Sequence, residues 1–319
     1  MDRLGRRPHQ ARLMAETTAA TGGPTTVPSF ADVADVTTRL RDTGYLADDA
    51  TATSTYLADR LGKPLLVEGP AGVGKTELAR AISQSTNAEF IRLQCYEGID
   101  EARALYEWNH AKQILHIQAT GTRDWDEAKS DIFSEEFLLP RPLLRAISRP
   151  EPTVLLIDEV DKADVDVEGL LLEVLSDFAV TIPEMGTVAA TRRPIVILTS
   201  NATRDLSEAL KRRCLYLYID FPDSVREREI LASRVPGLPD ALAAELVRVV
   251  GVLRTLDIRK KPSVAETIDW GNTLLALGAG ESTTGSGATL DDGLIARTLG
   301  VVLKHRPDLK TAFKELKLG

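Results

Sequence analysis

The sequence has few residues that could form a disulfide framework or a metal site built from protein ligands alone. Its 319 residues include two cysteines, Cys95 and Cys214, and four histidines. The cysteines lie too far apart in the chain for zinc-ligand spacing and make a disulfide framework implausible, so we expect a reducing compartment, the cytoplasm. His110 and His116 match neither one helix face nor a zinc pattern, which favours structural or surface roles.

Long hydrophobic runs are also lacking. No apolar stretch approaches the roughly 20 residues that a membrane-spanning helix needs. The start, MDRLGRRPHQARLM, is basic but has no hydrophobic segment of the kind found in secretory signals. It is similar in composition to a transit peptide or a disordered tail, and a true start at Met14 stays open. Residues 1–28 are low in complexity, and we expect them to form a disordered tail.

An excess of positive charge is the third feature that the sequence lacks. The formal net charge is -8 and the pI about 5.2. This argues against a surface built throughout for nucleic acid, and we expect no nucleic-acid partner, although a small basic patch is compatible with these values. Apolar residues make up 43% and charged residues 27%, as in globular proteins, and the length suffices for one large domain or two ordinary ones.

Short apolar runs before residue 223 predict the strands of a five-stranded parallel sheet. Segments with helical periodicity separate them, and they read PLLVEG, FIRLQC, TVLLIDE, RPIVILTSN and CLYLYIDF. Strands that alternate with helices form parallel sheets covered on both faces. Two helices should precede the first strand, one over residues 29–44 with Ser29 as its N-cap and one over 49–61 that stops at Gly62. We therefore predict an α/β domain over residues 29–222.

Only helical periodicity follows the last apolar run. Five segments between residues 223 and 319 carry it, and they are interrupted by GAGESTTGSGA, whose composition is that of a flexible loop. We predict a second, all-helical domain over residues 223–319, which would lie next to the α/β domain as a lid.

The first predicted strand leads into a glycine-rich sequence, GPAGVGKT, and then into a predicted helix. This is the strand–GxxxxGK[ST]–helix pattern of a phosphate-binding loop. Glycines let backbone N–H groups turn towards phosphate oxygens, and the helix adds its positive N-terminal end. Lys75 should reach the β- and γ-phosphates and the Thr76 hydroxyl should ligate Mg²⁺, so ATP and Mg²⁺ are the expected cofactors. The expected nucleotide-binding residues are Gly69, Pro70, Ala71, Gly72, Val73, Gly74, Lys75 and Thr76.

Two acidic residues, Asp158 and Glu159, come at the end of the third apolar run. A carboxylate at the end of a buried strand can hold Mg²⁺, and its neighbour can polarise a water molecule for attack on the γ-phosphate. The sequence DKAD at residues 161–164 is similar to the guanine-reading motif of G proteins, but it begins with aspartate and lies too early in the chain. We interpret it as a helix start with Asp164 as the cap.

The fourth apolar run ends in the polar residues Thr199, Ser200 and Asn201. An uncharged side chain at this point can contact the γ-phosphate or the attacking water. The alternative is that Asn201 or Asp205 caps the next helix. That helix, EALKRR, ends in three cations, whose interaction with a helix C-terminus contributes only about 0.3–1 kcal/mol each.

Together, the phosphate loop, acid pair, terminal asparagine, arginine-ended helix and helical lid resemble an AAA+ ATPase over residues 29–319. The segment at about 96–120 resembles the helix-2 insert of MoxR-like ATPases, and a predicted hairpin at about 180–193 resembles their pre-sensor hairpin. The stretches LQCYEGIDEARALYEWNHAKQ, EEFLLPRPLLRAI and KKPSVAETIDW are similar to the CoxD-like branch. That branch is associated with maturation of carbon monoxide dehydrogenase and related molybdenum hydroxylases.

The resemblance implies a homo-oligomer, typically a hexameric ring, with nucleotide at the subunit boundaries. By position, Asn201 matches sensor 1 and Arg213 matches the arginine finger, with Arg212 as its nearest rival. Because Lys75 already serves the phosphate loop of its own subunit, the arginine should serve the neighbour's. The expected catalytic residues are thus Lys75, Glu159, Asn201 and Arg213. The resemblance also implies a partner with a von Willebrand A-type domain and a metalloenzyme client.

One position departs from the MoxR-like pattern. Where those chains generally place an arginine just after a proline, this chain has Ser263, and the sequence from Ser263 to Glu266 predicts a capping box. The missing cation could come from Lys261, Lys260 or Arg259, or be absent.

The function that these residues favour is that of an ATP-hydrolysing ring that remodels a client protein. A nucleic-acid motor or clamp loader of the same superfamily is an alternative, but no basic helix or zinc module is visible. A nucleotide-dependent scaffold without turnover is another, and the intact set of charged site residues argues against it. Four apolar residues of the insert either pack on the core or face a client: Leu105, Trp108, Ile114 and Leu115.

Overall fold

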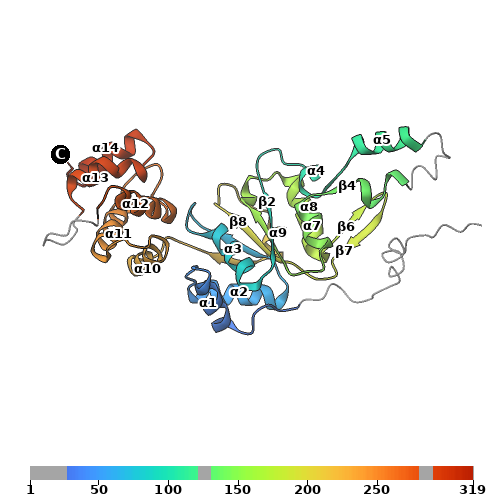
Figure 1. Ribbon diagram of the computed structural model, residues 1–319, viewed down its shortest axis with the longest axis horizontal. Helices are drawn as coiled ribbons and strands as arrows, with labels where there is room; N and C mark the ends of the chain where they lie inside the picture. Colours follow the sequence, from blue (N-terminus) through green and yellow to red (C-terminus); the bar gives the residue numbers. More distant parts are fainter. Residues whose placement is uncertain (1–26, 121–130, 280–289, 319) are drawn as a thin grey trace, which may run out of the picture.

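The computed structural model describes residues 27–120, 131–279 and 290–318. Nearly all of the expected tail, Met14 included, and most of the predicted loop GAGESTTGSGA lie outside these ranges. An α/β region forms the centre of the molecule, with the C-terminal helices at one end and an inserted segment at the other (Figure 1).

A five-stranded parallel sheet forms the core of the α/β region, which confirms the predicted fold class. Its strands are β1 (Leu65–Glu68), β2 (Glu89–Gln94), β5 (Thr153–Asp158), β8 (Ile195–Ser200) and β9 (Leu215–Tyr218). Their order in the sheet is β2-β5-β8-β1-β9, and all neighbours are parallel. Because parallel strands end at the same edge, the segments that follow β5, β8 and β1 meet at the middle of the carboxyl edge.

Helices cover both faces of the sheet, which explains why its three inner strands, β5, β8 and β1, are almost continuously apolar. The helices on one face are α1 (Val33–Asp42), α2 (Asp49–Leu61) and α3 (Lys75–Thr86), and those on the other are α7 (Pro142–Ser148), α8 (Val165–Asp177) and α9 (Glu208–Arg213). Alternate residues of a strand point to opposite faces. In β1, Leu65 and Val67 pack with the first group of helices, and Leu66 packs with the second.

The first helix begins later than predicted. Its N-cap is Asp32 and not Ser29, and the Asp32 carboxylate accepts a hydrogen bond from a backbone N–H of the first turn. The N–H groups of Ser29 and Phe30 instead donate to the Asp59 carboxylate of α2, at 2.7 and 3.0 Å. A carboxylate from another helix therefore holds the chain extended at Ser29 and moves the helix start to the next suitable cap.

Within the described residues, two antiparallel strand pairs lie outside the central sheet. One pairs β3 (Tyr106–Trp108) with β4 (Leu138–Pro140), and the other is a hairpin of β6 (Ala179–Ile182) and β7 (Gly186–Ala189). The first pair belongs to the inserted segment, together with α4 (Glu101–Ala104), α5 (His110–Thr120) and the 3-10 helix η1 (Glu135–Phe137). Because β4 pairs with β3, the insert continues past residue 120, beyond the end that we expected from the sequence.

The four apolar residues of the insert differ in their exposure to solvent. Leu105 is buried in the core beneath the insert, and Trp108 is half-buried against Phe133. Ile114 and Leu115 on α5 are 55% and 65% exposed. Figure 1 shows α5 projecting at the end of the molecule opposite to the C-terminal helices. The base of the insert is therefore part of the core, and α5 presents apolar side chains to solvent.

The chain after β9 is helical, as predicted. It comprises α10 (Ser224–Arg234), α11 (Asp240–Thr255), α12 (Val264–Ala276), α13 (Asp292–Thr298), the 3-10 helix η3 (Leu299–Val301) and α14 (Arg306–Glu315). These helices enclose a hydrophobic core of their own around the fully buried Trp270, whose indole N–H donates to Thr298. The buried Glu227 carboxylate pairs with Arg254 through contacts of 2.6 and 2.8 Å and so ties α10 to α11.

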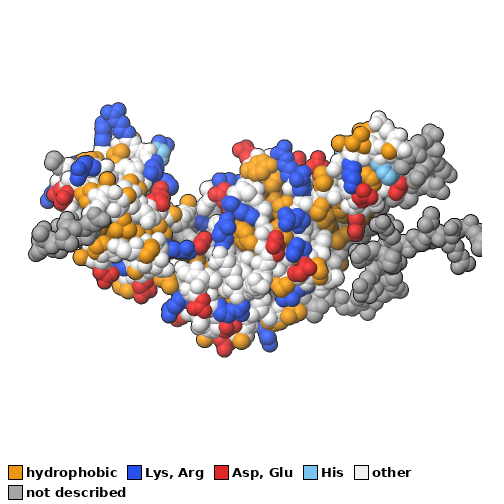
Figure 2. Space-filling model, viewed as in Figure 1, with side chains coloured by type: hydrophobic (Ala, Val, Ile, Leu, Met, Phe, Trp, Pro, Cys, Tyr) orange, Lys and Arg blue, Asp and Glu red, His pale blue; other side chains and the backbone are white. Residues whose placement is uncertain are grey.

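The surface charge is mixed. Acidic and basic side chains are interspersed on the face shown in Figure 2, and neither sign dominates it. This face lacks the continuous positive patch that typically attracts nucleic acid. Among the helices within the described ranges, none is both long and apolar enough to cross a membrane.

Candidate nucleotide-binding site

The phosphate loop connects β1 to α3 and needs glycine at several positions. Gly69, Gly72 and Gly74 have φ values of +150°, +75° and +101°, which side chains disfavour. At Gly69 an added Cβ would lie 1.9 Å from the Ile219 carbonyl oxygen, so no side chain fits between the loop and the segment after β9. The loop therefore depends on glycine both for its backbone conformation and for its close approach to the neighbouring strand.

Lys75 is the first residue of α3, and oxygens surround its ammonium group. Nζ donates to the carbonyl oxygens of Gly69 and Pro70, both at 2.7 Å, and to Asn201 Oδ1 at 2.8 Å. Burial lowers the pKa of this ammonium group, and nearby carboxylates, foremost Asp161, oppose that shift. Neutral oxygens of the loop and of Asn201 thus hold the ammonium group. Phosphate oxygens at the same place would bind it more strongly, because they are charged.

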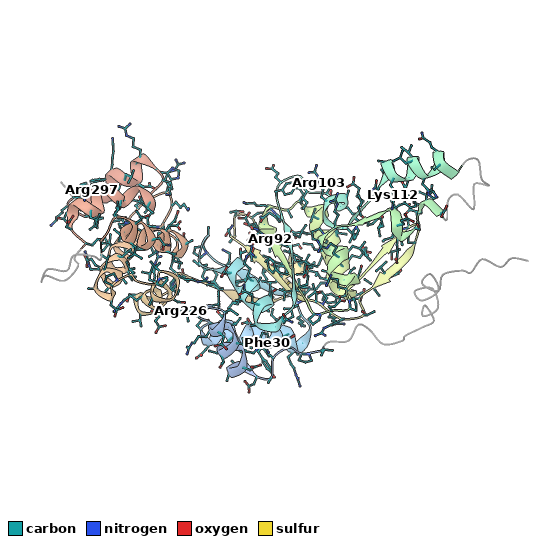
Figure 3. The ribbon with its side chains drawn as sticks, viewed as in Figure 1. Phe30, Arg92, Arg103, Lys112, Arg226 and Arg297 are labelled. Atoms are coloured by element: carbon teal, nitrogen blue, oxygen red, sulfur yellow. The ribbon has the colours of Figure 1, made fainter. Side chains whose placement is uncertain are left out.

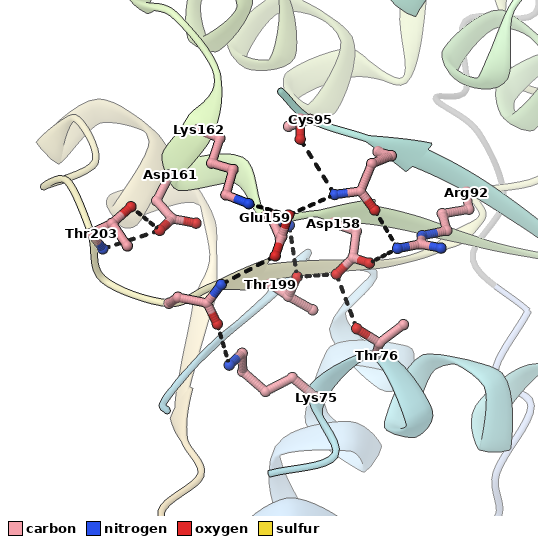
Figure 4. A network of polar contacts seen from close by, with 12 residues as sticks. Lys75, Thr76, Arg92, Cys95, Asp158, Glu159, Asp161, Lys162, Thr199 and Thr203 are labelled. Carbon is pink, nitrogen blue, oxygen red and sulfur yellow. Dashed lines mark hydrogen bonds and ion pairs between the residues drawn. The ribbon is translucent and has the colours of Figure 1, made fainter. Parts of the chain in front are cut away.

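The Asp158 carboxylate, at the end of β5, is contacted from three directions. Its side chain is 3% exposed. Oδ1 accepts hydrogen bonds from the hydroxyls of Thr76 at 3.1 Å and Thr199 at 2.5 Å, and Oδ2 accepts one from Arg92 Nη2 at 2.5 Å. Figure 4 shows how these contacts come from α3, β8 and β2 to meet at the one carboxylate.

Thr76 and Asp158 fit a magnesium ion in the chemistry of their donor atoms. Mg²⁺ takes oxygen ligands and is commonly held by one or two protein groups together with substrate phosphates. The Thr76 hydroxyl and Asp158 Oδ1 are 3.1 Å apart, so both can reach one ion. Within the described ranges, no group of three or more His, Cys, Asp or Glu side chains could hold a metal. At the candidate site, Thr76 and Asp158 supply two oxygen ligands, and a phosphate could supply others.

Glu159 follows Asp158 in the left-handed conformation, with a φ of +56°. This conformation is uncommon for residues other than glycine and is maintained by surrounding contacts. Its N–H donates to Thr199 Oγ1 at 2.9 Å. Its carboxylate accepts hydrogen bonds from Gln94 Nε2 at 2.9 Å, Lys162 Nζ at 2.7 Å and Asn201 Nδ2 at 3.4 Å. Hydrogen bonds thus hold both the backbone and the side chain of Glu159 (Figure 4).

Asn201 connects the phosphate loop to the acid pair. Its Oδ1 accepts from Lys75, and its Nδ2 donates weakly to Glu159. The alternative in which Asn201 or Asp205 caps the next helix is wrong, because the N-cap of α9 is Ser207. The side chain of Asn201 is therefore available to the site and lies between its two charged groups.

The segment between β8 and α9 is held by two buried carboxylates. Asp161, in the 3-10 helix η2 (Val160–Lys162), accepts hydrogen bonds from the N–H and the hydroxyl of Thr203. Burial alone would raise the pKa of Asp161, but the hydrogen bonds from Thr203 bring it below its usual value. Glu168 on α8 pairs with Arg204 at 2.5 Å. These contacts set the position from which α9 extends.

The cations at the end of α9 differ in their contacts. Arg213 Nε donates to Ser176 Oγ of α8 at 2.6 Å. Arg212 is exposed and makes no hydrogen bond or ion pair with the rest of the described chain. Asp164 is the N-cap residue of α8, as the sequence predicted, although its side chain makes no capping hydrogen bond.

A cleft of about 850 Å³ opens between the phosphate loop and the C-terminal helices. It is lined by residues 72–77, by part of the segment 44–48, by residues 218–223 and by α10 and α12. Its volume falls in the range of small-molecule sites, about 300–1,000 Å³. Arg226 of α10 closes one side through hydrogen bonds to the Leu46 carbonyl oxygen and the Asp48 carboxylate, so the C-terminal helices form part of the wall.

The start of α12 rests against the phosphate loop. An added Cβ on Gly72 would lie 2.5 Å from the Cβ of Ser263. Ser263 and Glu266 form the predicted capping box, with contacts of 3.2 and 2.8 Å between side chain and backbone. Lys260 pairs with Glu266 at 2.8 Å, so the carboxylate of the capping box engages one of the three cations considered for the missing arginine.

Sequence reasoning missed Arg92 and Gln94, although both contact the acid pair. They lie two residues apart on β2, the edge strand next to β5, and therefore point to the same face. The signal was the alternation of polar and apolar residues in FIRLQC, where Ile91 and Leu93 are buried. The apolar positions of that run predict a buried strand, and its polar positions lie on the face that meets the acid pair.

Comparisons with known proteins agree with this geometry. Residues 64–214 match the family described as AAA domain (dynein-related subfamily), and this range contains the whole phosphate loop, the acid pair and α9. The α/β region has an AAA+ P-loop fold. The match does not include the helices after β9, two of which line the cleft beside the phosphate loop.

Curated relatives are larger proteins. The chain is 28% identical to the negative regulator of genetic competence ClpC/MecB of Bacillus subtilis over 63% of its length, and 33% identical to the chaperone protein ClpB 1 of Synechocystis over 44%. A 34% identity to the chaperone protein ClpB of Oceanobacillus iheyensis extends over 42%. The matched regions make up 22%, 14% and 14% of those proteins, so the chain spans less than a quarter of the length of these relatives.

Replacing Thr199 with valine removes the hydroxyl that joins Asp158 to the backbone of Glu159. We expect the free energy of unfolding to fall by about 1–3 kcal/mol, because the Glu159 N–H loses its partner. Chemical denaturation measures this change. The matched control is Thr181→Val, whose hydroxyl lies on an exposed hairpin 3.1 Å from Thr187 and should change stability by no more than about 0.5 kcal/mol. Equal effects of the two substitutions would contradict a structural role for the Thr199 bridge.

Proposed function

We propose that this protein is a Mg²⁺-dependent ATPase that works as a ring-forming chaperone. The observation that carries the proposal is the convergence of Lys75, Asp158, Glu159 and Asn201 at one edge of the sheet, linked by hydrogen bonds of 2.8 Å between Lys75 and Asn201 and 3.4 Å between Asn201 and Glu159. Binding phosphate, holding a metal and activating water require these residue types side by side. The AAA domain match over residues 64–214 supports the same chemistry.

Each residue of the site has a role that follows from its position. The backbone N–H groups of the phosphate loop and the Lys75 ammonium bind the β- and γ-phosphates. The Thr76 hydroxyl and the Asp158 carboxylate hold Mg²⁺, which when bound neutralises charge on the phosphates. Glu159 accepts the proton of the attacking water, once it is released from the contacts that hold it in the resting network. Asn201 orients that water or the γ-phosphate.

Arg213 completes the site of a neighbouring subunit. It lies at the end of α9, docked on Ser176, while the ammonium of Lys75 already serves the phosphate loop of its own chain. A guanidinium stabilises the charge that develops on the γ-phosphate and in related sites contributes roughly 10³–10⁵ in rate. Arg212, which has no such docking contact, is the less suitable of the two. Trans action of this kind requires an oligomer, and a hexameric ring is the form that we propose.

The cellular role that we propose is maturation of a metalloenzyme, by opening a folded client protein. The relatives named as ClpB chaperones support a chaperone role, and the resemblance of the insert and of KKPSVAETIDW to the CoxD-like branch of MoxR-like ATPases supports a molybdenum hydroxylase client. A von Willebrand A-type partner belongs to the same proposal. Ile114 and Leu115 on the projecting α5 are apolar side chains that such a client could contact.

Glu159→Gln tests the proposed reaction. The amide cannot accept a proton from water, so ATP hydrolysis should fall by at least about 10²-fold, while nucleotide affinity stays within a few-fold of the wild type. Phosphate release and equilibrium binding of ATP measure the two quantities. Glu173→Gln, on the neighbouring helix α8, is the control for loss of one acidic group and should hydrolyse ATP like the wild type. Undiminished hydrolysis by Glu159→Gln would contradict the assignment.

Mixed oligomers test the trans action of Arg213. We expect Arg213→Ala to bind ATP but to lose hydrolysis, and Lys75→Ala to lose nucleotide binding. Mixing the two variants should restore part of the activity, because a Lys75→Ala subunit still offers Arg213 to an intact phosphate loop. Phosphate release at several mixing ratios measures the recovery. Mixtures that stay as inactive as their components would argue against action between subunits.

A further inference from the structure

Arg92 places a guanidinium at the carboxylate to which we assign the metal. Arg92 Nη2 lies 2.5 Å from Asp158 Oδ2, in the only ion pair that the Asp158 side chain makes within the described ranges. The strand register puts Arg92 opposite Leu156, two residues before Asp158 on the neighbouring strand. The side chain therefore reaches forward along the sheet to the end of β5. Figure 3 places the labelled Arg92 in the central α/β region, and Figure 4 shows its contact with Asp158.

The two partners of this ion pair differ in their freedom to move. The Asp158 side chain is 3% exposed and held by two hydroxyl groups, whereas the Arg92 side chain is 40% exposed. Arg92 also lies on β2, an edge strand of the sheet. The guanidinium can thus leave towards water without any change in the backbone, and the carboxylate cannot.

Arg92 is also connected to Glu159. Its Nη2 donates to Gln94 Oε1, and the other side of that amide, Nε2, donates to Glu159 Oε2 at 2.9 Å. A primary amide has one acceptor and one donor end, so the guanidinium on Oε1 orients Nε2 towards the Glu159 carboxylate. The same cation therefore neutralises Asp158 and orients the group that holds Glu159.

We propose that Arg92 is a displaceable internal cation that competes with Mg²⁺ for the Asp158 carboxylate. A carboxylate oxygen that already accepts a guanidinium N–H at 2.5 Å is less available to a metal ion. With Mg²⁺ held at Asp158, the guanidinium would lie away from the carboxylate, towards solvent. Arg92 is in this sense a positioning residue, and the inference rests on the function proposed above.

The test is the Mg²⁺ dependence of nucleotide binding to the full chain. The probe is ATP carrying a fluorescent N-methylanthraniloyl group, titrated with Mg²⁺ from a solution that contains a chelator. Arg92→Gln removes the competing charge, so we expect half-maximal binding at roughly tenfold lower Mg²⁺, which corresponds to about 1.4 kcal/mol. In chelator alone the same variant should bind the probe more weakly than the wild type, because Asp158 then repels the phosphates without a compensating charge.

Two further variants separate this competition from other effects. Arg145→Gln removes a half-exposed arginine on α7 that pairs at 3.8 Å with Glu89 of β2, the strand that also carries Arg92. The Mg²⁺ midpoint of this variant should equal that of the wild type. Arg92→Lys keeps the charge, and its midpoint should lie much closer to the wild type than to Arg92→Gln. A thermal melt of each variant reports loss of folding, which lowers binding at every Mg²⁺ concentration but does not move the midpoint downwards.

The outcomes are distinct. A lower midpoint for Arg92→Gln, absent from Arg145→Gln and largely reversed in Arg92→Lys, supports the proposal. A midpoint for folded Arg92→Gln equal to or above that of the wild type overturns it, as does an equal shift in Arg92→Lys. If Arg92→Gln does not fold, the Arg92→Lys midpoint decides: a value close to that of the wild type is expected, and one roughly tenfold below it overturns the proposal. A wild type that does not bind the probe with Mg²⁺ contradicts the proposed function itself.

Discussion

The buried Asp158 carboxylate is the group on which the rest of the site depends. A charge that is 3% exposed is stable only with charged or hydrogen-bonding partners, and here they come from three different elements. The strand order β2-β5-β8-β1-β9 makes this possible, because it places β5 between β2 and β8 and brings the start of α3 within reach. Fold and site are thus linked, because the hydrogen bonds and the ion pair to the Asp158 carboxylate align the helix that begins at Lys75 with β2 and β8.

The same contacts hold the charged groups of the site in a resting arrangement. Lys75 is bound by loop carbonyls and Asn201, Asp158 by a guanidinium, and Glu159 by Gln94 and Lys162. Each charged group therefore has a partner that phosphate, metal or water could replace. Nucleotide binding would then exchange one set of satisfied contacts for another, which avoids leaving a buried charge unpaired at any stage.

Much of the fold could be predicted from the sequence, because glycine, strand and helix patterns are local. The five strands, the capping box at Ser263 and the position of the phosphate loop all depend on residues within a few positions of one another. The start of α1 could not, because Asp59 from another helix competes for the Ser29 N–H. Arg92 and the pairing of β3 with β4 were missed for the same reason: each depends on a partner more than 25 residues away.

The most direct measurement of the central claim is a crystal structure of the full chain with Mg²⁺ and a non-hydrolysable ATP analogue. We expect the phosphates to lie in the loop, with the Lys75 ammonium moved from Asn201 and the loop carbonyls to phosphate oxygens. Thr76 and Asp158 should then face the metal, directly or through its water ligands. Nucleotide bound elsewhere, or a Lys75 that keeps all three of its present contacts beside bound phosphate, would contradict the assignment of this site.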